Sequence, residues 1–299
     1  MPDRELMQAA ACLPPQLREV LRRWEGAEHP ACEEIRLRAG CPMTVVTPQG
    51  EIPTKTRPLT VPQIQDTIDR ACDYSAHTFA ANISQGYLTL PGGHRIGICG
   101  DAVWDGGAIK SFRSISSVNI RIARQIRGAA SEQMVQTICQ NKMLRSTLIY
   151  SPPRFGKTTL LRDLIFRLSE MGYRIGVADE RAELAALYRG QPQFQIGLHT
   201  DVITGCPKAE AAMMLVKTMS PDAVVLDEIT SERDVQAVLY CSRCGAAVFA
   251  SAHASGLADF QIRPLYRSVW ESQAFSLYYE IHRDRTVQLR KENKEEAAC

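Results

Sequence analysis

The N-terminal part of the chain contains hydrophobic patterns of more than one period. In 33–51, EEIRLRAGCPMTVVTPQGE, apolar and polar positions alternate around a Gly-Cys-Pro turn, which predicts a hairpin. Residues 61–75 repeat an apolar residue at every fourth position after a proline, and this spacing predicts a helix. Residues 86–124 predict a meander of short strands, because Pro-Gly-Gly and Asp-Gly-Gly interrupt them. Residues around 128–145 predict a helix that leads into a second domain.

From residue 146 onward, apolar runs of strand length alternate with amphipathic helices. The predicted strands are 146–150, 173–179, 223–228 and 246–252, and the predicted helices are 158–172, 208–219 and 231–245. This order is typical of an α/β fold with a mostly parallel sheet covered on both faces, whose ligands bind beyond the carboxyl ends of the strands. We therefore expect a smaller α+β N-terminal domain (1–140), a parallel-sheet domain (141–288) and a frayed, charged tail (289–299).

Composition restricts the class of protein only modestly. The chain has 299 residues, 45% of them hydrophobic and 23% charged, and is long enough for two globular domains. A formal net charge of +2 and a pI of about 8.0 give no global field that would recruit nucleic acid. The ten cysteines form no short-spaced framework, and the N-terminus has no apolar signal core. The cysteine pattern and the missing signal core therefore favour reduced thiols in a cytoplasm. No apolar run reaches the length of about 18 residues that spans a bilayer, so we expect at most peripheral membrane contact.

The stretch 150–164, YSPPRFGKTTLLRDL, contains the clearest chemical motif. A phosphate-binding loop lies between a strand and a helix and follows the pattern Gly-x4-Gly-Lys-Ser/Thr. The second half is intact as Gly156-Lys157-Thr158. Loop N–H groups and the helix N-terminus would face the phosphates of ATP, Lys157 would reach the β- and γ-phosphates, and Thr158 would ligate Mg²⁺. The candidate nucleotide-binding residues are Ser151, Pro152, Pro153, Arg154, Phe155, Gly156, Lys157, Thr158 and Thr159.

Two positions of this loop depart from the pattern, because Ser151 and Arg154 stand where glycine is expected. Serine has a β-carbon and resists positive φ, so we expect strain or a slight re-routing of the loop at Ser151. The alternative interpretation is a Pro-rich turn between strand and helix in which a threonine caps the helix.

A second motif lies in 221–230, PDAVVLDEIT, where Asp227 and Glu228 end a short apolar strand. One carboxylate in this position can hold Mg²⁺, and its neighbour can orient the attacking water. Acidic residues before a helix can also be plain N-caps. Together with the lysine-bearing loop, the pair favours nucleotide hydrolysis.

Two further strand ends carry candidate residues. Asp179-Glu180-Arg181 ends the predicted strand 173–179; either the three form an ion-pair cluster, or Glu180 polarises water and Arg181 contacts the ligand. His253 follows the strand 246–252 on the same predicted edge. This histidine is either structural or placed to sense a γ-phosphate.

Other polar clusters give weaker signals. Cys241-x-x-Cys244 supplies only two of the four ligands that a structural zinc requires. The basic run from Lys110 to Arg127 lacks acidic residues, and it could be a solvated face, a nucleic-acid groove or the source of an arginine that reaches a neighbouring subunit. Because few aromatic residues accompany it, recognition of bases by stacking is the weakest of the three.

Six segments of the chain resemble the stage III sporulation protein AA family of endospore-forming Firmicutes: 33–40, 89–100, 114–124, 150–164, 177–184 and 221–229. The likeness extends over most of the chain, and its N-terminal segments belong to no generic nucleotide-binding pattern. More broadly, 226–255 is similar to the hexameric ATPases of type II and type IV secretion and pilus systems.

The resemblance implies a RecA-like P-loop ATPase that forms a homo-hexameric ring and binds ATP with Mg²⁺. It implies Walker A residues Gly156, Lys157 and Thr158, Walker B residues Asp227 and Glu228, an acidic-box residue Glu180 and a histidine-box residue His253. Family members commonly have glycine at the positions of Ser151 and Arg154. It further implies a place at the mother-cell cytoplasmic face of a channel to the forespore, with membrane proteins of that channel as partners and no specific nucleic acid.

The expected function is therefore that of an ATP-hydrolysing motor or assembly ATPase. Lys157 and the loop hold the phosphates, Thr158 and Asp227 hold Mg²⁺, and Glu228 or Glu180 activates water. Two alternatives stay open: a scaffold that binds nucleotide with little hydrolysis, and a translocase stimulated by nucleic acid.

Overall fold

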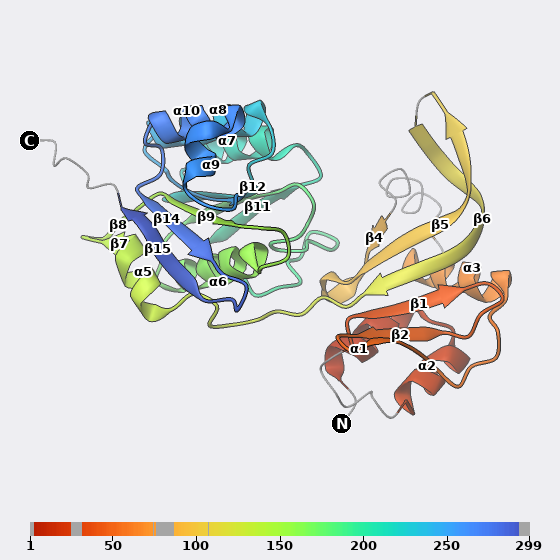
Figure 1. Ribbon diagram of the computed structural model, residues 1–299. Coiled ribbons are helices and arrows are strands. Elements are labelled where there is room, and N and C mark those ends of the chain that lie inside the picture. Colours follow the sequence, from red (N-terminus) through yellow and green to blue (C-terminus); the bar gives the residue numbers. More distant parts are fainter. Residues whose placement is uncertain (1–2, 25–31, 74, 76–86, 107, 293–299) are drawn as a thin grey trace, which may run out of the picture. The chain divides into compact units, whose positions relative to one another are not determined.

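A computed structural model describes residues 3–24, 32–73, 75, 87–106 and 108–292, and the chain divides into two compact units, Met1–Arg124 and Gln125–Cys299 (Figure 1). Among the described residues, no helix is long and apolar enough to cross a bilayer. The prediction placed the boundary between the domains at residues 140 and 141, further along the chain.

The first unit is an antiparallel sheet with helices packed on one face. The sheet has the order β3-β2-β1-β6-β5-β4. Its strands are β1 Glu34–Arg38, β2 Thr44–Thr47, β3 Gly50–Pro53, β4 Tyr87–Thr89, β5 Arg95–Asp105 and β6 Ala108–Arg121. The helices are α1 Arg4–Ala9, α2 Pro15–Arg22 and α3 Val61–Ala71, with short 3-10 turns η1 Ala10–Cys12 and η2 Pro91–Gly93. The predicted hairpin and helix are confirmed, and the fold class is the predicted α+β arrangement.

The meander of short strands was only partly correct, because β5 and β6 form one long hairpin that Figure 1 shows in yellow. Three shifts of register leave Lys110, Arg113 and Ser116 of β6 without a partner residue on β5. Each extra residue is a bulge, so apolar residues three apart in β6 fall on the same face of the hairpin. A β-carbon on Gly100 would lie 2.0 Å from the Ser114 carbonyl oxygen, so the strand needs glycine beside the first bulge.

Arg124 joins the ends of the first unit. Its guanidinium forms an ion pair with Asp3, which also caps α1 by accepting hydrogen bonds from the N–H groups of Glu5 and Leu6. Arg124 donates a further bond to the Cys32 carbonyl (3.2 Å). The last residue of this unit therefore fixes its first helix.

The second unit is a seven-stranded sheet of order β11-β10-β12-β13-β9-β14-β15. The strands from β11 to β14 in this order run parallel, and only β15 is antiparallel. Their bounds are β9 Thr147–Ser151, β10 Ile175–Asp179, β11 Thr200–Thr204, β12 Ala223–Glu228, β13 Ala247–His253, β14 Leu277–Ile281 and β15 Val287–Glu292. A small hairpin, β7 Cys139–Gln140 and β8 Met143–Leu144, stands apart from this sheet. The predicted mostly parallel sheet is confirmed.

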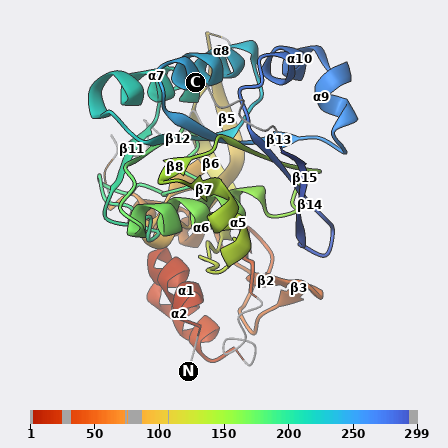
Figure 2. The same cartoon turned by 90° about the vertical axis from the view of Figure 1, so that its left-hand side faces the viewer.

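Helices cover both faces of this sheet (Figures 1 and 2). One layer consists of α5 Glu132–Ile138 and α6 Lys157–Glu170. The other consists of α7 Lys208–Met219, α8 Glu232–Arg243, α9 Ala258–Ile262 and α10 Pro264–Glu271. The strands β9 and β10 are buried along their whole length, as expected for parallel strands between two helical layers.

Contacts with α6 explain why residues after 124 belong to the second unit. Asp163 accepts hydrogen bonds from the N–H groups of Gly128 (3.1 Å) and Ala130 (2.9 Å), and Arg167 donates to the Ala130 carbonyl (2.5 Å). The segment that precedes α5 is thus fastened to α6.

The predicted tail from residue 289 needs a correction at its start. Residues 289–292 belong to β15, whose pairing with β14 gives these charged residues an ordered place at the edge of the sheet. The remainder, 293–299, lies outside the described residues.

Candidate functional site

The loop between β9 and α6 has the geometry of an anion-binding turn. Gly156 precedes the helix with φ 102°, a left-handed conformation that suits glycine, and α6 begins at Lys157. Ser151 lies in β9 opposite His253 and has no positive φ, so the strain expected there is absent. Arg154 is the strained residue, with φ 68°. The correction has a simple cause: Ser151 is still part of an extended strand, and the chain first turns after it.

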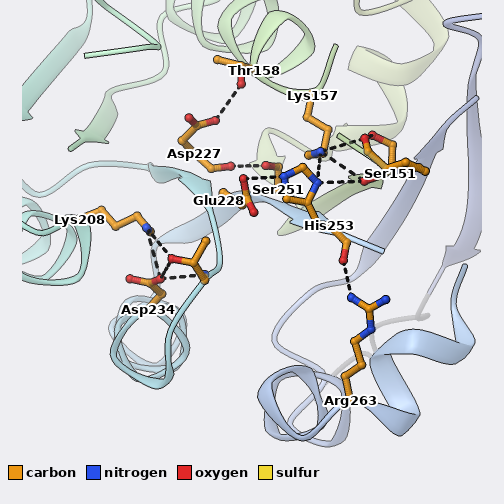
Figure 3. A network of polar contacts seen from close by, with 12 residues as sticks. Ser151, Lys157, Thr158, Lys208, Asp227, Glu228, Asp234, Ser251, His253 and Arg263 are labelled. Carbon is orange, nitrogen blue, oxygen red and sulfur yellow. Dashed lines mark hydrogen bonds and ion pairs between the residues drawn. The ribbon is translucent and has the colours of Figure 1, made fainter. Parts of the chain in front are cut away.

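Lys157 is almost fully buried at the end of this loop. Its ammonium group donates to the carbonyl oxygens of Ser151 and Pro152 (3.3 Å each) and to Nδ1 of His253 (2.8 Å), as Figure 3 shows. Burial lowers the pKa of Lys157, while the nearby charges of Glu228 and Asp227 oppose that shift. A buried cation held only by neutral acceptors is well placed to exchange them for a phosphate.

Thr158 joins the loop to the end of β12. Its hydroxyl donates to Oδ1 of Asp227 at 3.2 Å (Figure 3). The Asp227 backbone is fixed from the next strand, because the Ser251 hydroxyl donates to its carbonyl. Burial, then the charges of Glu183 and Asp179, raise the pKa of the Asp227 carboxyl to about 7. A hydroxyl and a half-buried carboxylate in contact form a donor set that suits Mg²⁺.

Glu228 and His253 form a second contact at this edge. The Lys157 ammonium donates to Nδ1 of His253, so that nitrogen is an acceptor and the ring proton lies on Nε2. Nε2 is 3.1 Å from a carboxylate oxygen of Glu228, to which it donates. Arg263 in turn donates to the His253 carbonyl (2.9 Å). The histidine therefore joins Lys157 to Glu228, a role the sequence reasoning had not specified.

The predicted pair Glu180 and Arg181 lies elsewhere on this edge. Both residues are exposed, and a Glu180 oxygen is 3.4 Å from the ammonium group of Lys208. Lys208 also contacts Asp234 and the Thr230 hydroxyl, so Glu180 is part of an ion-pair cluster at the start of α7. The structure thus brings together six predicted residues, Ser151, Lys157, Thr158, Asp227, Glu228 and His253, but not Glu180.

Sequence reasoning missed Glu183, whose charge contributes more than those of Asp179 and Glu228 to the raised pKa of Asp227. Asp179 accepts hydrogen bonds from the N–H groups of residues 183, 184 and 185 at 2.8 to 3.0 Å, and these bonds hold the Glu183 backbone at the end of β10. The signal was present in 179–183, DERAE, which has two glutamates, but spacing alone does not tell which one faces the site. Arg162 of α6 is buried beside the same turn.

The other predicted loop residues are more open. Pro153 and Arg154 are exposed, and Phe155 and Thr159 are half-buried. In the basic run, Arg113, Arg121 and Arg124 lie within 4 Å of the carboxylates of Asp101, Glu34 and Asp3 respectively. Cys241 is buried and Cys244 exposed, and the described residues hold no group of three or more potential metal-binding histidine, cysteine or acidic side chains.

Comparison with solved structures defines the class of fold. The chain is similar to the Legionella pneumophila ATPase DotB, with a TM-score of 0.57 and 15% identity over 93% of this chain and 80% of that one. It is also similar to the pilus retraction motor PilT with bound ADP, with a TM-score of 0.61 and 15% identity over 94% and 83% of the two chains. The parallel sheet with its lysine-bearing loop is thus the RecA-like fold of the secretion and pilus ATPases.

Sequence comparison defines the family. The model of the family described as "Sporulation stage III, protein AA" matches residues 4–288. Stage III sporulation protein AA of Bacillus subtilis (strain 168) is 37% identical over 282 residues, which cover 92% of this chain and 91% of that protein. The chain belongs to the stage III sporulation protein AA family, as the resemblance of its segments had indicated.

Proposed function

We propose that this chain hydrolyses ATP with Mg²⁺ as a motor or assembly ATPase of sporulation. The observation that carries the proposal is the convergence of Lys157, the Thr158–Asp227 pair and the Glu228–His253 pair at the carboxyl end of a parallel sheet. This edge is where ligands of such sheets bind. The family membership and the fold of the secretion ATPases support the same reading.

The residues present fit a Mg²⁺–nucleotide. The N-terminus of α6, 14 residues long, presents unpaired N–H groups at the loop, and a β-carbon placed on Gly156 would point into open space. Lys157 and the loop residues 151–156 would hold the phosphates, while Thr158 and Asp227 would hold the cation. Bound Mg²⁺ supplies neutralisation of the phosphate charge during phosphoryl transfer.

The proposed roles of the remaining side chains follow from their contacts. Lys157 leaves the carbonyls of Ser151 and Pro152 and binds phosphate oxygens. Glu228 accepts a proton from the attacking water, and His253 holds the Glu228 carboxylate in place through Nε2. Glu180 is retained as an alternative water-activating residue, although its contact with Lys208 favours Glu228 for this role.

At the level of assembly, we propose a homo-hexameric ring at the mother-cell cytoplasmic face of a channel to the forespore. Membrane proteins of that channel are the proposed partners, so membrane contact is peripheral. A translocase that grips nucleic acid through Lys110–Arg127 is less favoured, since Arg113, Arg121 and Arg124 of that run lie near carboxylates.

The test is Mg²⁺-dependent ATP hydrolysis by the purified chain over a range of protein concentrations. We expect turnover whose specific activity rises as the ring assembles, and a loss of at least about 100-fold in Lys157→Ala. Lys217→Ala on α7 is the matched control and should retain turnover. Turnover that survives in both Lys157→Ala and Glu228→Gln would contradict the proposal.

A nucleotide-locked scaffold is the second candidate, and the strained Arg154 in the loop favours it. In that case the assembled chain binds ATP, measured by equilibrium dialysis, without releasing phosphate. Lys157→Ala would then abolish binding and assembly together.

A further inference from the structure

A short turn after β10 is held in a conformation that its own residues do not favour. Ala182 has φ 52° and Ala186 has φ 51°, so two alanines with β-carbons adopt the left-handed region on either side of residues 183–185. Such a conformation is unfavourable for a residue with a β-carbon and persists only where the surroundings impose it. Something outside the turn must therefore hold it.

Two buried side chains of opposite charge, Asp179 and Arg162, stabilise this turn. Asp179 accepts hydrogen bonds from the N–H groups of Glu183 (2.8 Å), Leu184 (3.0 Å) and Ala185 (2.8 Å). Arg162 donates from the opposite side, with Nη2 to the Glu183 carbonyl (2.6 Å) and Nε to the Leu184 carbonyl (3.1 Å). The peptide groups around Glu183 are thus bonded through both their N–H and their C=O groups.

The Arg162 guanidinium is itself fixed within the second unit. Arg162 is only 8% exposed, and its guanidinium lies 3.9 Å from the centroid of the Phe194 ring. Burial lowers the pKa of Arg162, whereas the charges of Asp179, Asp227 and Glu183 favour its charged form. Lysine cannot replace Arg162 here, because only the planar guanidinium can donate to two carbonyl groups while it stacks on the Phe194 ring.

The conformation of the turn 182–186 determines where the Glu183 carboxylate lies. Ala178 of β10 pairs with Leu226 of β12, so Asp179 and Asp227 lie side by side at the ends of neighbouring strands, and the Glu183 N–H donates to the Asp179 carboxylate. The Glu183 charge also raises the pKa of Asp227, whose carboxyl accepts the hydroxyl of Thr158. Arg162 belongs to α6, the helix that begins with Lys157 and Thr158. One helix therefore carries the residues that would bind the Mg²⁺–nucleotide and the arginine that fixes an acidic residue opposite them.

We infer that Arg162 is a positioning residue: it clamps the turn 182–186 so that the Glu183 carboxylate stays beside Asp227, where it orients water for hydrolysis. The inference rests on the proposed function and deepens it. Arg162 donates to the carbonyl groups of Glu183 and Leu184, so it acts through the backbone of the turn. Its loss should therefore lower turnover without loosening nucleotide binding.

The experiment is a double-mutant cycle with Arg162→Met and Glu183→Gln in the full-length chain. We expect each variant to lower kcat by about 10- to 100-fold, with KM for ATP and the Kd for ADP changed less than about threefold. If Arg162 acts through Glu183, the double variant should be no slower than the slower single variant, because interacting sites are not additive. Multiplicative losses, or an unchanged kcat in Glu183→Gln, would overturn the inference.

Two further variants separate positioning from general destabilisation. Arg162→Lys keeps the buried charge and should fold, but it cannot make both carbonyl bonds, so we expect an intermediate loss of kcat. Arg167→Met is the matched control, since Arg167 lies on the same helix and donates to the Ala130 carbonyl, away from the turn. A loss of kcat in Arg167→Met equal to that in Arg162→Met would show that any defect of α6 suffices.

Amide hydrogen exchange in the nucleotide-free chain tests the clamp without turnover. We expect the amides of Glu183, Leu184 and Ala185 to exchange at least about 10-fold faster in Arg162→Met, and those of β12 and β13 to keep their rates. Unchanged rates at the three amides would refute the clamp. If the wild-type chain hydrolyses no ATP, the proposed function fails, and the exchange rates still decide whether Arg162 holds the turn.

Discussion

In the N-terminal unit the half-buried Asp3 and Arg124 are paired with each other, whereas in the parallel-sheet unit Lys157, Asp179 and Asp227 lie together at the carboxyl edge of the sheet. Burial would raise the pKa of Asp3, but the hydrogen bonds and charge of Arg124 outweigh it and hold that pKa below its ordinary value. At the edge of the other sheet, burial dominates, so the pKa of Asp227 is raised and that of Lys157 is lowered. Burial and neighbouring charges act in both units, but the charge of the partner prevails at Asp3 and burial prevails at Asp227 and Lys157.

The difference shows what each group of charges does. A carboxyl whose pKa is lowered on folding stabilises the folded chain at neutral pH, and one whose pKa is raised opposes folding there. The Asp3–Arg124 pair therefore stabilises the first unit. The charges at the edge of the second sheet cost stability in the free chain, which is the expected signature of a site prepared for a charged ligand.

Glu228→Gln should give the largest effect and tests whether this edge performs chemistry. Glutamine keeps the size of the side chain and its contact with His253 but cannot accept a proton. We expect kcat for ATP to fall by about 100- to 1,000-fold, with little change in ADP binding. Glu210→Gln, an exposed glutamate of α7, is the control and should retain kcat. Equal turnover in the two variants would show that Glu228, at the edge of the second sheet, takes no part in catalysis.

Much of the second unit could be predicted from the sequence, because its elements obey simple periods. The helix 208–219 and the strand 223–228 were predicted with the bounds that the structure shows. The sequence predicts that Lys157, Thr158 and Asp227 lie close together, because parallel strands place their carboxyl ends at the same edge of a sheet. Charged strands such as β15 were missed, since only their pairing with a neighbour reveals them.

Irregular backbone accounts for what sequence reasoning could not supply. The three bulges of β6 change the side-chain period from two to three, so the long hairpin had no alternating pattern to detect. The choice between Glu180 and Glu183 depends on the left-handed alanines 182 and 186, which no propensity predicts. Both failures concern residues whose conformation is imposed by distant contacts.

Asp3→Asn should have the next largest effect and tests whether the pair in the first unit is stabilising. Asparagine still caps α1, so the variant removes only the charge opposite Arg124. We expect the free energy of unfolding of this unit to fall by about 2 to 3 kcal/mol at pH 7, measured by urea unfolding. The loss should shrink as the pH falls through the lowered pKa of Asp3, because the wild-type carboxyl is then neutral.

Glu5→Gln is the control for this measurement. Glu5 also lies near Arg124, at 3.6 Å, but its side chain is 45% exposed, so the loss should be below about 1 kcal/mol. An Asp3→Asn variant as stable as the wild type would remove the contrast between the two units. ATP turnover per folded chain should be unchanged in both variants.

Asp227→Asn should show the opposite sign. Between about pH 4 and pH 7 the folded chain binds a proton at Asp227 that the unfolded chain releases, so this group's contribution to stability falls as the pH rises and is lowest above pH 7. We expect the variant to gain about 1 to 2 kcal/mol in free energy of unfolding at pH 8, and the gain to fade toward pH 4. Urea unfolding at pH 8, 6 and 5 measures it.

The same variant should lose ATP hydrolysis, since asparagine is a poor replacement for a carboxylate toward Mg²⁺. Stability and activity would then move in opposite directions at one residue. A variant that is less stable than the wild type at pH 8 would show that Asp227 is held by favourable contacts, as Asp3 is, and that both units treat their charges alike.

Arg154→Gly should have the smallest effect and locates the strain within the loop. Arg154 is exposed and has φ 68°, a conformation that is unfavourable for a residue with a β-carbon. Glycine removes that cost but adds freedom to the unfolded chain, and we expect a net gain of about 0.5 to 1 kcal/mol. Arg154→Ala keeps the β-carbon and should gain nothing, whereas Ser151→Gly, at an extended position, should destabilise the strand. A gain in free energy of unfolding in Ser151→Gly instead of Arg154→Gly would place the strain at Ser151, where the sequence predicts it. The order of the three variants by stability therefore decides which of the two residues that replace glycine strains the loop.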